Sequence, residues 1–259
     1  GGISGAAGRP PIGLLSVAED IYSIGALTKR YASPDGDEEF TLEVPSLTIR
    51  RGQRVGIVAE SGFGKSTLLD LLLFALKPSS AESFVFRTDD RSTDVAEAWR
   101  AGGSGAFSDI RKHHIGAVIQ TGGLLPFVSA RANIELPCRI LGRPYREPAQ
   151  RLAEHLDIVA QLDLYPRQLS IGQRQRVAIA RALVHQPLLV IADEPTASLD
   201  SGNAQRVMEL LVDLTEGSGV TLIMASHDLS LVSRYGFNVL NHERAPTEGD
   251  GPRSRFWSA

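Results

Sequence analysis

A glycine-rich turn between an apolar strand and a helix constrains this chain more than any other feature. After the apolar run Arg54–Val58 come Ala59, Glu60, Ser61, Gly62, Phe63, Gly64, Lys65, Ser66 and Thr67. Gly62 and Gly64 allow the backbone to approach phosphate oxygens and to point its N–H groups at them. The positive end of the following helix dipole adds to that field. The order of strand, loop and helix therefore predicts a P-loop for a nucleoside triphosphate.

Each residue of this loop has an expected contact. Lys65 is predicted to reach the β- and γ-phosphates, and the Ser66 hydroxyl to bind Mg²⁺. The other phosphate contacts are assigned to Ser61, Gly62, Gly64 and Thr67. Position 59 holds alanine where the strict pattern has glycine, and alanine is penalised at positive φ. A loop of this kind indicates only a nucleoside triphosphate, as in kinases, GTPases and motor proteins alike.

The apolar pattern predicts an α/β fold. Residues 115–119, 188–192 and 220–225 are short and nearly all apolar, which is typical of a parallel sheet covered on both faces. Helical periodicity over 65–76, 173–184 and 204–214 alternates with them, as in a doubly wound, RecA-like P-loop core. The alternation at 40–44, with strands at 47–49 and 54–58, favours an antiparallel β subdomain before the loop.

Five regions are expected along the chain. They are a flexible extension (1–20), an antiparallel β and P-loop part of the core (21–120), a helical subdomain (121–172), the remainder of the core (173–240) and a C-terminal tail (241–259). The polar, glycine-containing segment 79–112 is predicted to be a flexible loop. The tail has little periodicity and is expected to lack order.

Composition excludes several function classes. The net charge of −3 gives no reason to expect nucleic acid as a partner. No apolar run approaches the roughly 20 residues of a membrane helix. The chain's start shows no secretion signal, so a cytoplasmic location is expected. Cys138 is the single cysteine, which excludes an internal disulfide and a cysteine metal cluster.

Two further clusters carry chemistry. Asp193 and Glu194 follow an apolar run; the first carboxylate suits the water shell of Mg²⁺, and the second suits activation of an attacking water. Ser170 and Gly172 precede a predicted helix and form a second anion site. One chain cannot readily bring both anion sites to the same γ-phosphate. A partner subunit is therefore expected to supply the second site.

Together these segments resemble the ABC ATPase family over about residues 21–240. The run Leu169, Ser170, Ile171, Gly172, Gln173 is similar to the family's signature Leu-Ser-Gly-Gly-Gln. Gln120 resembles the glutamine of the Q-loop, and the run from Pro195 to Asp200 resembles the D-loop. His227 resembles the switch histidine. Tyr31 lies where the family has its adenine-stacking aromatic, with Phe40 as a competitor.

The resemblance implies ATP and Mg²⁺ as ligands and a second ATPase subunit, identical or different, as partner. Glu194 would activate water, His227 and Lys65 would stabilise the γ-phosphate, and Ser66, Gln120 and Asp193 would hold the metal. Nucleotide contacts would further come from Tyr31, Gln120, Ser170, Gly172, Gln173 and Asp200. Replacement of the signature's first glycine by Ile171 leaves these groups in place.

Segments 122–126, 133–137 and 165–168 look like the lipoprotein-release and macrolide-export group. That likeness implies an integral-membrane permease that contacts the helical subdomain near Gln120 and holds the subunit at the inner face of the cell membrane. The alternative is an ABC ATPase that acts as a scaffold or regulator without transport, of the cell-division or iron–sulfur-assembly type. A P-loop kinase is a third, weaker alternative.

Overall fold

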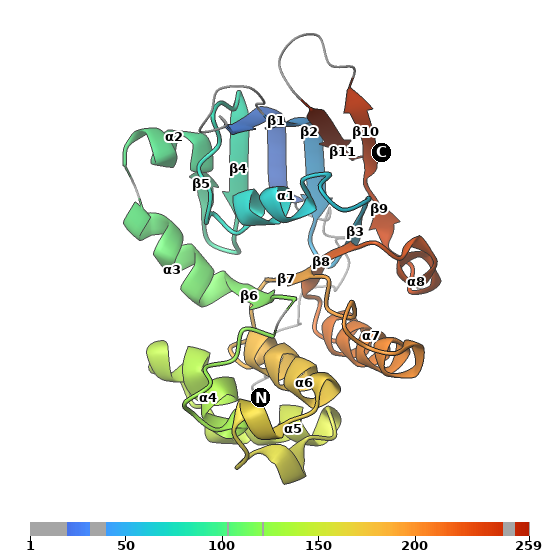
Figure 1. Ribbon diagram of the computed structural model, residues 1–259. Coiled ribbons are helices and arrows are strands. Elements are labelled where there is room, and N and C mark those ends of the chain that lie inside the picture. Colours follow the sequence, from blue (N-terminus) through green and yellow to red (C-terminus); the bar gives the residue numbers. More distant parts are fainter. Residues whose placement is uncertain (1–19, 32–39, 103, 121, 246–251, 259) are drawn as a thin grey trace, which may run out of the picture.

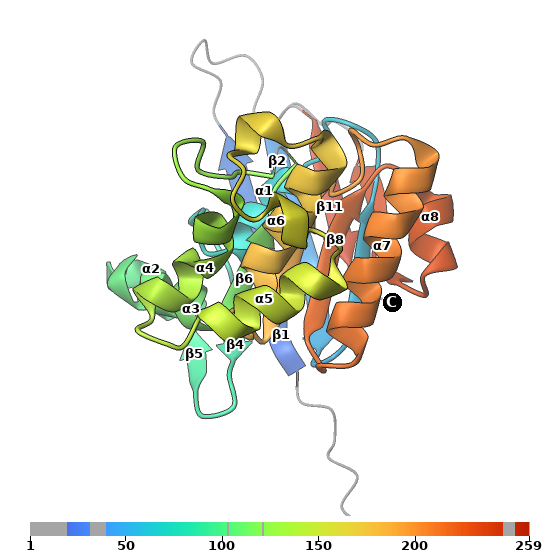
Figure 2. The ribbon, with the colours of Figure 1, turned by 90° about the horizontal axis from the view of Figure 1, so that it is seen from below.

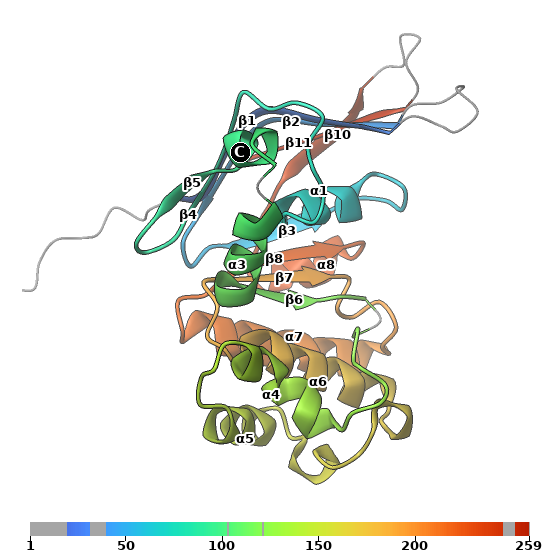
Figure 3. The same ribbon diagram turned by 90° about the vertical axis from the view of Figure 1, so that its left-hand side faces the viewer.

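The computed structural model describes residues 20–31, 40–102, 104–120, 122–245 and 252–258. Two β-sheets face each other across helix α1 (Lys65–Leu72), and helices cover the far face of the second sheet (Figure 3). The expected extension 1–20 lies outside the described residues, except for Asp20, with which β1 begins.

The first sheet has the order β10-β11-β2-β1-β4-β5. Its strands are β1 (Asp20–Tyr31), β2 (Phe40–Arg50), β4 (Ser83–Arg87), β5 (Ser92–Asp94), β10 (Asn241–Ala245) and β11 (Arg253–Trp257). The long pair β1 and β2 is antiparallel, with Leu27 opposite Val44. Residues 47–49, predicted as a separate strand, are the second half of β2. Strand β11 runs parallel to β2, so the sheet is mixed.

The second sheet is parallel and has the order β6-β7-β8-β3-β9. It comprises β3 (Arg54–Val58), β6 (Ile115–Val118), β7 (Leu189–Asp193), β8 (Thr221–Ser226) and β9 (Asn238–Val239). Every residue of β8 is buried, as expected of a strand covered on both faces. The predicted α/β class, with an antiparallel part and a doubly wound P-loop core, is confirmed.

Further helices cover the parallel sheet on the face away from α1, and others pack on these. On the face of the parallel sheet away from α1 lie α6 (Ile171–Leu183) and α7 (Ser201–Glu216) (Figure 3). Helices α4 (Ala130–Ile140) and α5 (Arg146–His155) pack on α6 (Figures 1 and 2). Two 3₁₀ turns (Val159–Gln161 and Pro166–Gln168) lead into α6. The short helix α8 (Leu229–Arg234) follows β8.

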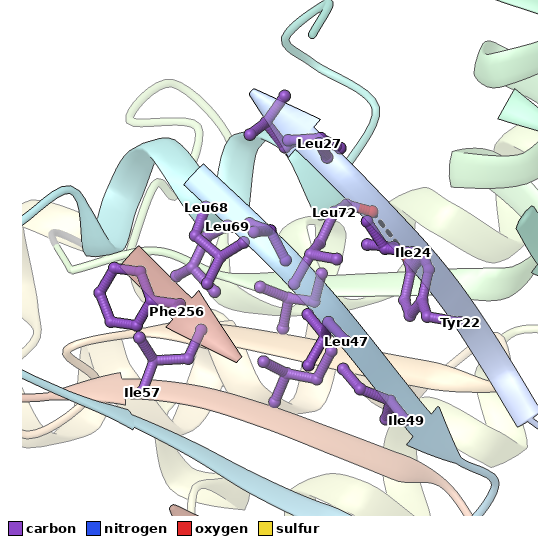
Figure 4. Packing of buried hydrophobic residues seen from close by; sticks show 14 of the residues in the cluster. Tyr22, Ile24, Leu27, Leu47, Ile49, Ile57, Leu68, Leu69, Leu72 and Phe256 are labelled. Atoms are coloured by element: carbon purple, nitrogen blue, oxygen red, sulfur yellow. Dashed lines mark hydrogen bonds between the residues drawn. The ribbon is translucent and has the colours of Figure 1, made fainter. Parts of the chain in front are cut away.

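Helix α1 is held on both sides by the main core (Figure 4). Leu68, Leu69 and Leu72 are buried between the two sheets. The hydroxyl of Tyr22 donates a 2.5 Å hydrogen bond to the carbonyl of Leu72 at the end of the helix. A helix end leaves carbonyls without partners, and this bond satisfies one of them inside the core. Because α1 is fixed, the loop before it is fixed too.

The segment 79–112 is not a flexible loop. It contains β4, β5, α2 (Val95–Arg100) and α3 (Ser104–His114). The Trp99 and Phe107 rings lie 4.5 Å apart, and Phe107 stacks on Phe74 at 5.6 Å. A few aromatic side chains anchor these short elements, while their polar residues face solvent. The segment is polar on average, and this average concealed the few aromatic residues that hold it in place.

The expectation of a disordered tail is also wrong for residues 241–245 and 253–257, which form strands. Strands β10 and β11 form an antiparallel hairpin, and β11 adds to the edge of β2. Ser254 and Phe256 are buried while their neighbours are half-buried. Pairing with a strand more than 200 residues earlier gives this segment its order, and no local pattern reports such a pairing.

Candidate functional site

The glycine-rich loop connects β3 to α1 beneath the first sheet. Gly62 and Gly64 have φ of 76° and 94°, in the left-handed region that glycine tolerates. At Gly64 a Cβ would lie 2.8 Å from Cζ of Phe40, so a side chain there would force the Phe40 ring to shift. Ala59 is not among the described residues with positive φ. The alanine at that position therefore adds no backbone strain.

The Lys65 side chain is enclosed by the backbone of the glycine-rich loop. It is 7% exposed, and its amine donates to the carbonyls of Ala59 at 2.7 Å and Glu60 at 3.2 Å. The same nitrogen is 3.5 Å from Oε1 of Glu194. The loop therefore places one ammonium group beside the backbone turn and next to the acidic end of β7.

Asp193 at the end of β7 meets the first turn of α1. The Ser66 hydroxyl donates to Oδ2 of Asp193 at 3.2 Å. Burial raises the pKa of Asp193, and the neighbouring Glu194 adds to the rise. Burial together with Asp193 also raises the pKa of Asp70 on α1. A hydroxyl beside a carboxylate whose charge is poorly compensated fits Mg²⁺, which prefers oxygen ligands.

Glu194 occupies a strained position. Its φ is 45°, which costs a residue with a side chain on the order of 1–3 kcal/mol. Its backbone N–H donates to the carbonyl of Ala225 at 3.0 Å, which fixes this turn at the end of the sheet. The carboxylate then lies between Lys65 and His227, whose Nδ1 is 3.5 Å from Oε2. His227 is 61% exposed, so its other ring nitrogen can meet a ligand.

One hollow of about 430 Å³ brings most of the predicted residues together. Its lining consists of Phe40, Ser61, Gly62, Gly64, Lys65, Ser66, Thr67, Gln120, Asp193 and Glu194. Tyr31 does not line it; its ring centroid lies 6.3 Å from that of Phe40. The competing aromatic, Phe40, is therefore the ring at the loop. No pattern in the sequence reports this, because the place of Phe40 beside Gly64 depends on how the strands align.

A second hollow, of about 920 Å³, surrounds the start of α6. The Ser170 hydroxyl accepts the N–H of Gln173, and the Gln173 side chain returns to the N–H of Ser170. Gly172 and Gln173 line this hollow together with Asp200, whose carboxylate caps α7. Among the described residues, none lines both hollows. The two halves of the predicted site are thus separate on one chain.

Sequence reasoning missed a link between the two hollows. Arg181, on the last turns of α6, donates to the carbonyls of Gly122 at 2.9 Å and Gly123 at 2.7 Å. These glycines follow Gln120, which lines the first hollow. Arginine in an amphipathic helix gives no signal of its own, because its partners are backbone carbonyls far away in the chain. Helix α6 therefore carries Ser170 at one end and holds the Gln120 segment at the other.

Comparison with known proteins shows the family to which this chain is similar. The family model "ABC transporter" matches residues 42–197. The uncharacterized ABC transporter ATP-binding protein YbbA of Escherichia coli K12 is 37% identical over 222 residues, which cover 84% of this chain and 92% of YbbA.

Other relatives are longer. The macrolide export ATP-binding/permease protein MacB of Nitrosomonas europaea is 39% identical over 217 residues, 83% of this chain and 31% of MacB. The methionine import ATP-binding protein MetN of Rhizobium meliloti is 35% identical over 83% of this chain and 58% of MetN. The chain thus spans less than two thirds of these two relatives.

Two solved structures share the fold. The dimeric ATP-binding cassette MJ0796, in a post-hydrolysis state bound to ADP and Pi, has a TM-score of 0.68 and 29% identity, covering 90% of this chain and 97% of that one. CbiO1 from Clostridium perfringens, part of the ABC transporter complex cbiONQ, has a TM-score of 0.71 and 29% identity, covering 92% of this chain and 87% of that one.

The raised pKa of Asp193 predicts an unusual pH dependence of stability. An ionised carboxylate whose folded pKa exceeds its unfolded value (about 3.9) lowers stability at neutral pH, and this loss disappears as the pH falls through the folded pKa. Asp193→Asn should therefore raise the melting temperature of the ligand-free protein at pH 7, with a gain that shrinks toward acid pH.

Asp200→Asn is the matched control for this measurement. Hydrogen bonds from Asn203 lower the pKa of Asp200, so its charge is favourable and the substitution should give no gain at pH 7. Thermal melts at several pH values decide the matter. A melting temperature of Asp193→Asn at or below the wild-type value at pH 7 would contradict the assignment of an uncompensated carboxylate.

Proposed function

This chain belongs to the ABC transporter family, and from that premise we propose that it binds ATP with Mg²⁺ at the Lys65 loop and hydrolyses it. One observation carries the proposal: the Glu194 carboxylate is held between the Lys65 amine and the His227 ring, beside the Ser66–Asp193 pair. A base, two cationic or hydrogen-bonding groups and a metal-binding pair converge where the loop would hold the terminal phosphate.

Binding follows from the loop. The backbone N–H groups around Gly62 and Gly64, together with the α1 dipole, would hold the phosphates, with Ser61 and Thr67 at the edges of the hollow. Lys65 would exchange its bonds to the backbone carbonyls for phosphate oxygens. Phe40 offers a ring beside the loop for the adenine, and Tyr31 lies behind it as a second aromatic surface.

Hydrolysis requires a water held near the γ-phosphate. Glu194 would orient this water and accept its proton, while His227 and Lys65 would stabilise the charge on the phosphate oxygens. Ser66, Asp193 and Gln120 would hold Mg²⁺, which when bound neutralises charge on the phosphates. The strained backbone at Glu194 fits this role, because strain of this kind gathers at working residues.

Glu194→Gln should lower the rate of ATP hydrolysis on the order of 10²–10⁴-fold, the contribution of a general base. ATP binding should persist, because the amide retains the size of the side chain and removes only its proton-accepting charge. Phosphate release measures the rate, and calorimetry measures the binding. Glu209→Gln on the exposed side of α7 is the control and should hydrolyse ATP like the wild type. Wild-type hydrolysis by Glu194→Gln would exclude the proposed base.

The second hollow supports a shared site. We propose that two subunits enclose two ATP molecules, each between the Lys65 loop of one chain and Ser170, Gly172, Gln173 and Asp200 of the other. The separation of the two hollows on one chain gives the reason, since neither contains the groups of the other. The cassette MJ0796, similar to this chain, is a dimer. The backbone N–H groups in the first turn of α6 can donate hydrogen bonds to an anion.

Mixed dimers test this arrangement. Lys65→Ala should remove the loop's contact with phosphate, and Ser170→Arg should block the second hollow, so each variant alone should be inactive. Mixing the two variants should restore part of the hydrolysis, because one site in the mixed dimer combines an intact loop with an intact Ser170. The control is each variant alone at the same total protein concentration as the mixture. If mixing restores nothing while both variants still bind each other, the shared site is wrong.

A partner in the membrane is the further part of the proposal. No helix in the described ranges is long and apolar enough to cross a membrane. A groove between α3, β6, α4 and α6 has a volume of about 500 Å³, and β6, which lines it, ends two residues before Gln120. Its apolar lining includes Ile140, which is 60% exposed, and Ile119, directly after β6, is 44% exposed. Exposed apolar side chains in one region mark an interaction site.

We propose that an integral-membrane permease docks on this groove and keeps the subunit at the inner face of the cell membrane, in a system for export or extraction. The name of MacB joins an ATP-binding part to a permease, and this chain matches 31% of it. The alternative is a regulatory or scaffold ATPase without transport, which would need no such groove. Arg181 would carry movement from the groove to α6, since it lines the groove and binds Gly122 and Gly123.

Co-purification distinguishes these two functions. The wild type, purified from a detergent extract of cells, should bring down an integral-membrane protein in stoichiometric amount. Ile140→Asp should lose this protein, because a charge enters the apolar groove, yet it should fold normally since the side chain is already exposed. Leu229→Asp, an equally exposed apolar residue on α8, is the control. A wild type that retains no membrane protein would favour the scaffold function.

A further inference from the structure

The phosphate loop carries one large apolar side chain, Phe63, and its ring is not exposed. Phe63 lies between the two left-handed glycines, Gly62 and Gly64. The ring points into the protein. Only 7% of the residue is exposed, and it belongs to the main core. The loop is therefore attached to the body of the molecule by a side chain at its centre.

Within the described part of the chain, the aromatic and cationic contacts of this ring come from the C-terminal hairpin of β10 and β11. The ring of His242 meets Phe63 edge-on at 5.0 Å, and Phe256 meets it edge-on at 5.6 Å. The guanidinium of Arg244 lies 5.4 Å from the Phe63 centroid, in a cation–π contact. His242 and Arg244 are two residues apart on β10, so they lie on the same face of the strand.

The hairpin itself is firmly attached to the first sheet. Phe256 is fully buried, and Arg253–Arg255 of β11 lie opposite residues 41–43 of β2. The Arg255 guanidinium is 2.6 Å from the Glu43 carboxylate and 3.2 Å from that of Glu243. An ion pair on a sheet surface adds little alone, but the pairs join both hairpin strands to β2. The contacts around Phe63 are thus made by a rigid element.

A glycine-rich loop needs such an anchor. Two glycines leave the backbone of residues 61–64 with a large conformational entropy, which is lost when the N–H groups are arranged around an anion. Fixing Phe63 at the middle of the loop removes part of that freedom beforehand. On its other flank the loop meets Phe40, whose ring lies where a Cβ of Gly64 would be. Preorganisation of this kind raises affinity by lowering the cost of binding.

We propose that the C-terminal hairpin is a positioning element of the phosphate loop: His242, Arg244 and Phe256 hold the Phe63 ring and so keep the loop arranged for a triphosphate. The inference rests on the proposed ATP site, and it adds that a distant segment of the chain regulates ATP binding there. Any partner or modification that lifts β10 from the loop would weaken ATP binding without touching a group that contacts the nucleotide.

The double variant His242→Ala/Arg244→Ala tests this directly, because both side chains are exposed and their removal leaves the buried core unchanged. The KM for ATP should rise about tenfold, the size expected from losing one aromatic and one cation–π contact, while kcat stays near the wild-type value. Hydrogen exchange of the amides of residues 60–66 should be faster in the nucleotide-free double variant. The control is Asn241→Ala, on the opposite face of the same strand and outside the Arg255 ion pairs, which should keep wild-type values.

Phe63 supplies a second, independent measurement. Phe63→Ala should raise KM at least as much as the double variant, and Phe63→Tyr should restore it, because the ring rather than the loop sequence is what the hairpin holds. A double variant with wild-type KM and wild-type exchange would overturn the inference even if Phe63→Ala fails to fold. A wild-type protein that binds no ATP would instead overturn the proposed function, so the two failures are distinguishable.

Discussion

The burial of α1 between the two sheets is the constraint on which the candidate site depends. One face of the helix packs on the first sheet through Leu68, Leu69 and Leu72, and its end is bonded to Tyr22. The helix begins at Lys65, so its rotation and depth decide where the ammonium group lies. A parallel sheet places the ends of neighbouring strands at one edge, and Asp193 and Glu194 meet Lys65 there. A shift of α1 would separate all of these groups at once.

Helix α6 plays the corresponding part for the second hollow. Its buried face packs on the parallel sheet, while its first turn presents Ser170 and Gly172 to solvent. Because a helix moves as a rigid body, the bonds from Arg181 to Gly122 and Gly123 link any movement of the Gln120 segment to that first turn. The two hollows are separate in space, and these hydrogen bonds through α6 connect them.

The sequence predicted most of the parallel core and the residues of the loop, since these features are local. Lys65, Ser66 and Glu194 follow strands whose apolar runs are visible, and the hollow unites them as expected. Sequence reasoning failed where order comes from distant pairing: β10 and β11 depend on β2, and α2 and α3 depend on aromatic contacts such as Trp99 with Phe107. The exchange of Tyr31 for Phe40 at the hollow also arises from how β1 and β2 align, which a motif position cannot reveal.

The site keeps several unfavourable features that the rest of the fold avoids. Glu194 has a left-handed backbone, Asp193 is a carboxylate whose charge burial disfavours, and Gly62 and Gly64 carry the entropy of a flexible loop. In the proposed function a bound nucleotide would relieve two of these, because its phosphates would arrange the loop and Mg²⁺ would compensate the charge of Asp193. Stability lost in the ligand-free chain would then be recovered as binding free energy when the nucleotide binds. In that balance the aromatic contact of Phe63 with the hairpin limits how much of the loop's freedom ATP itself must remove.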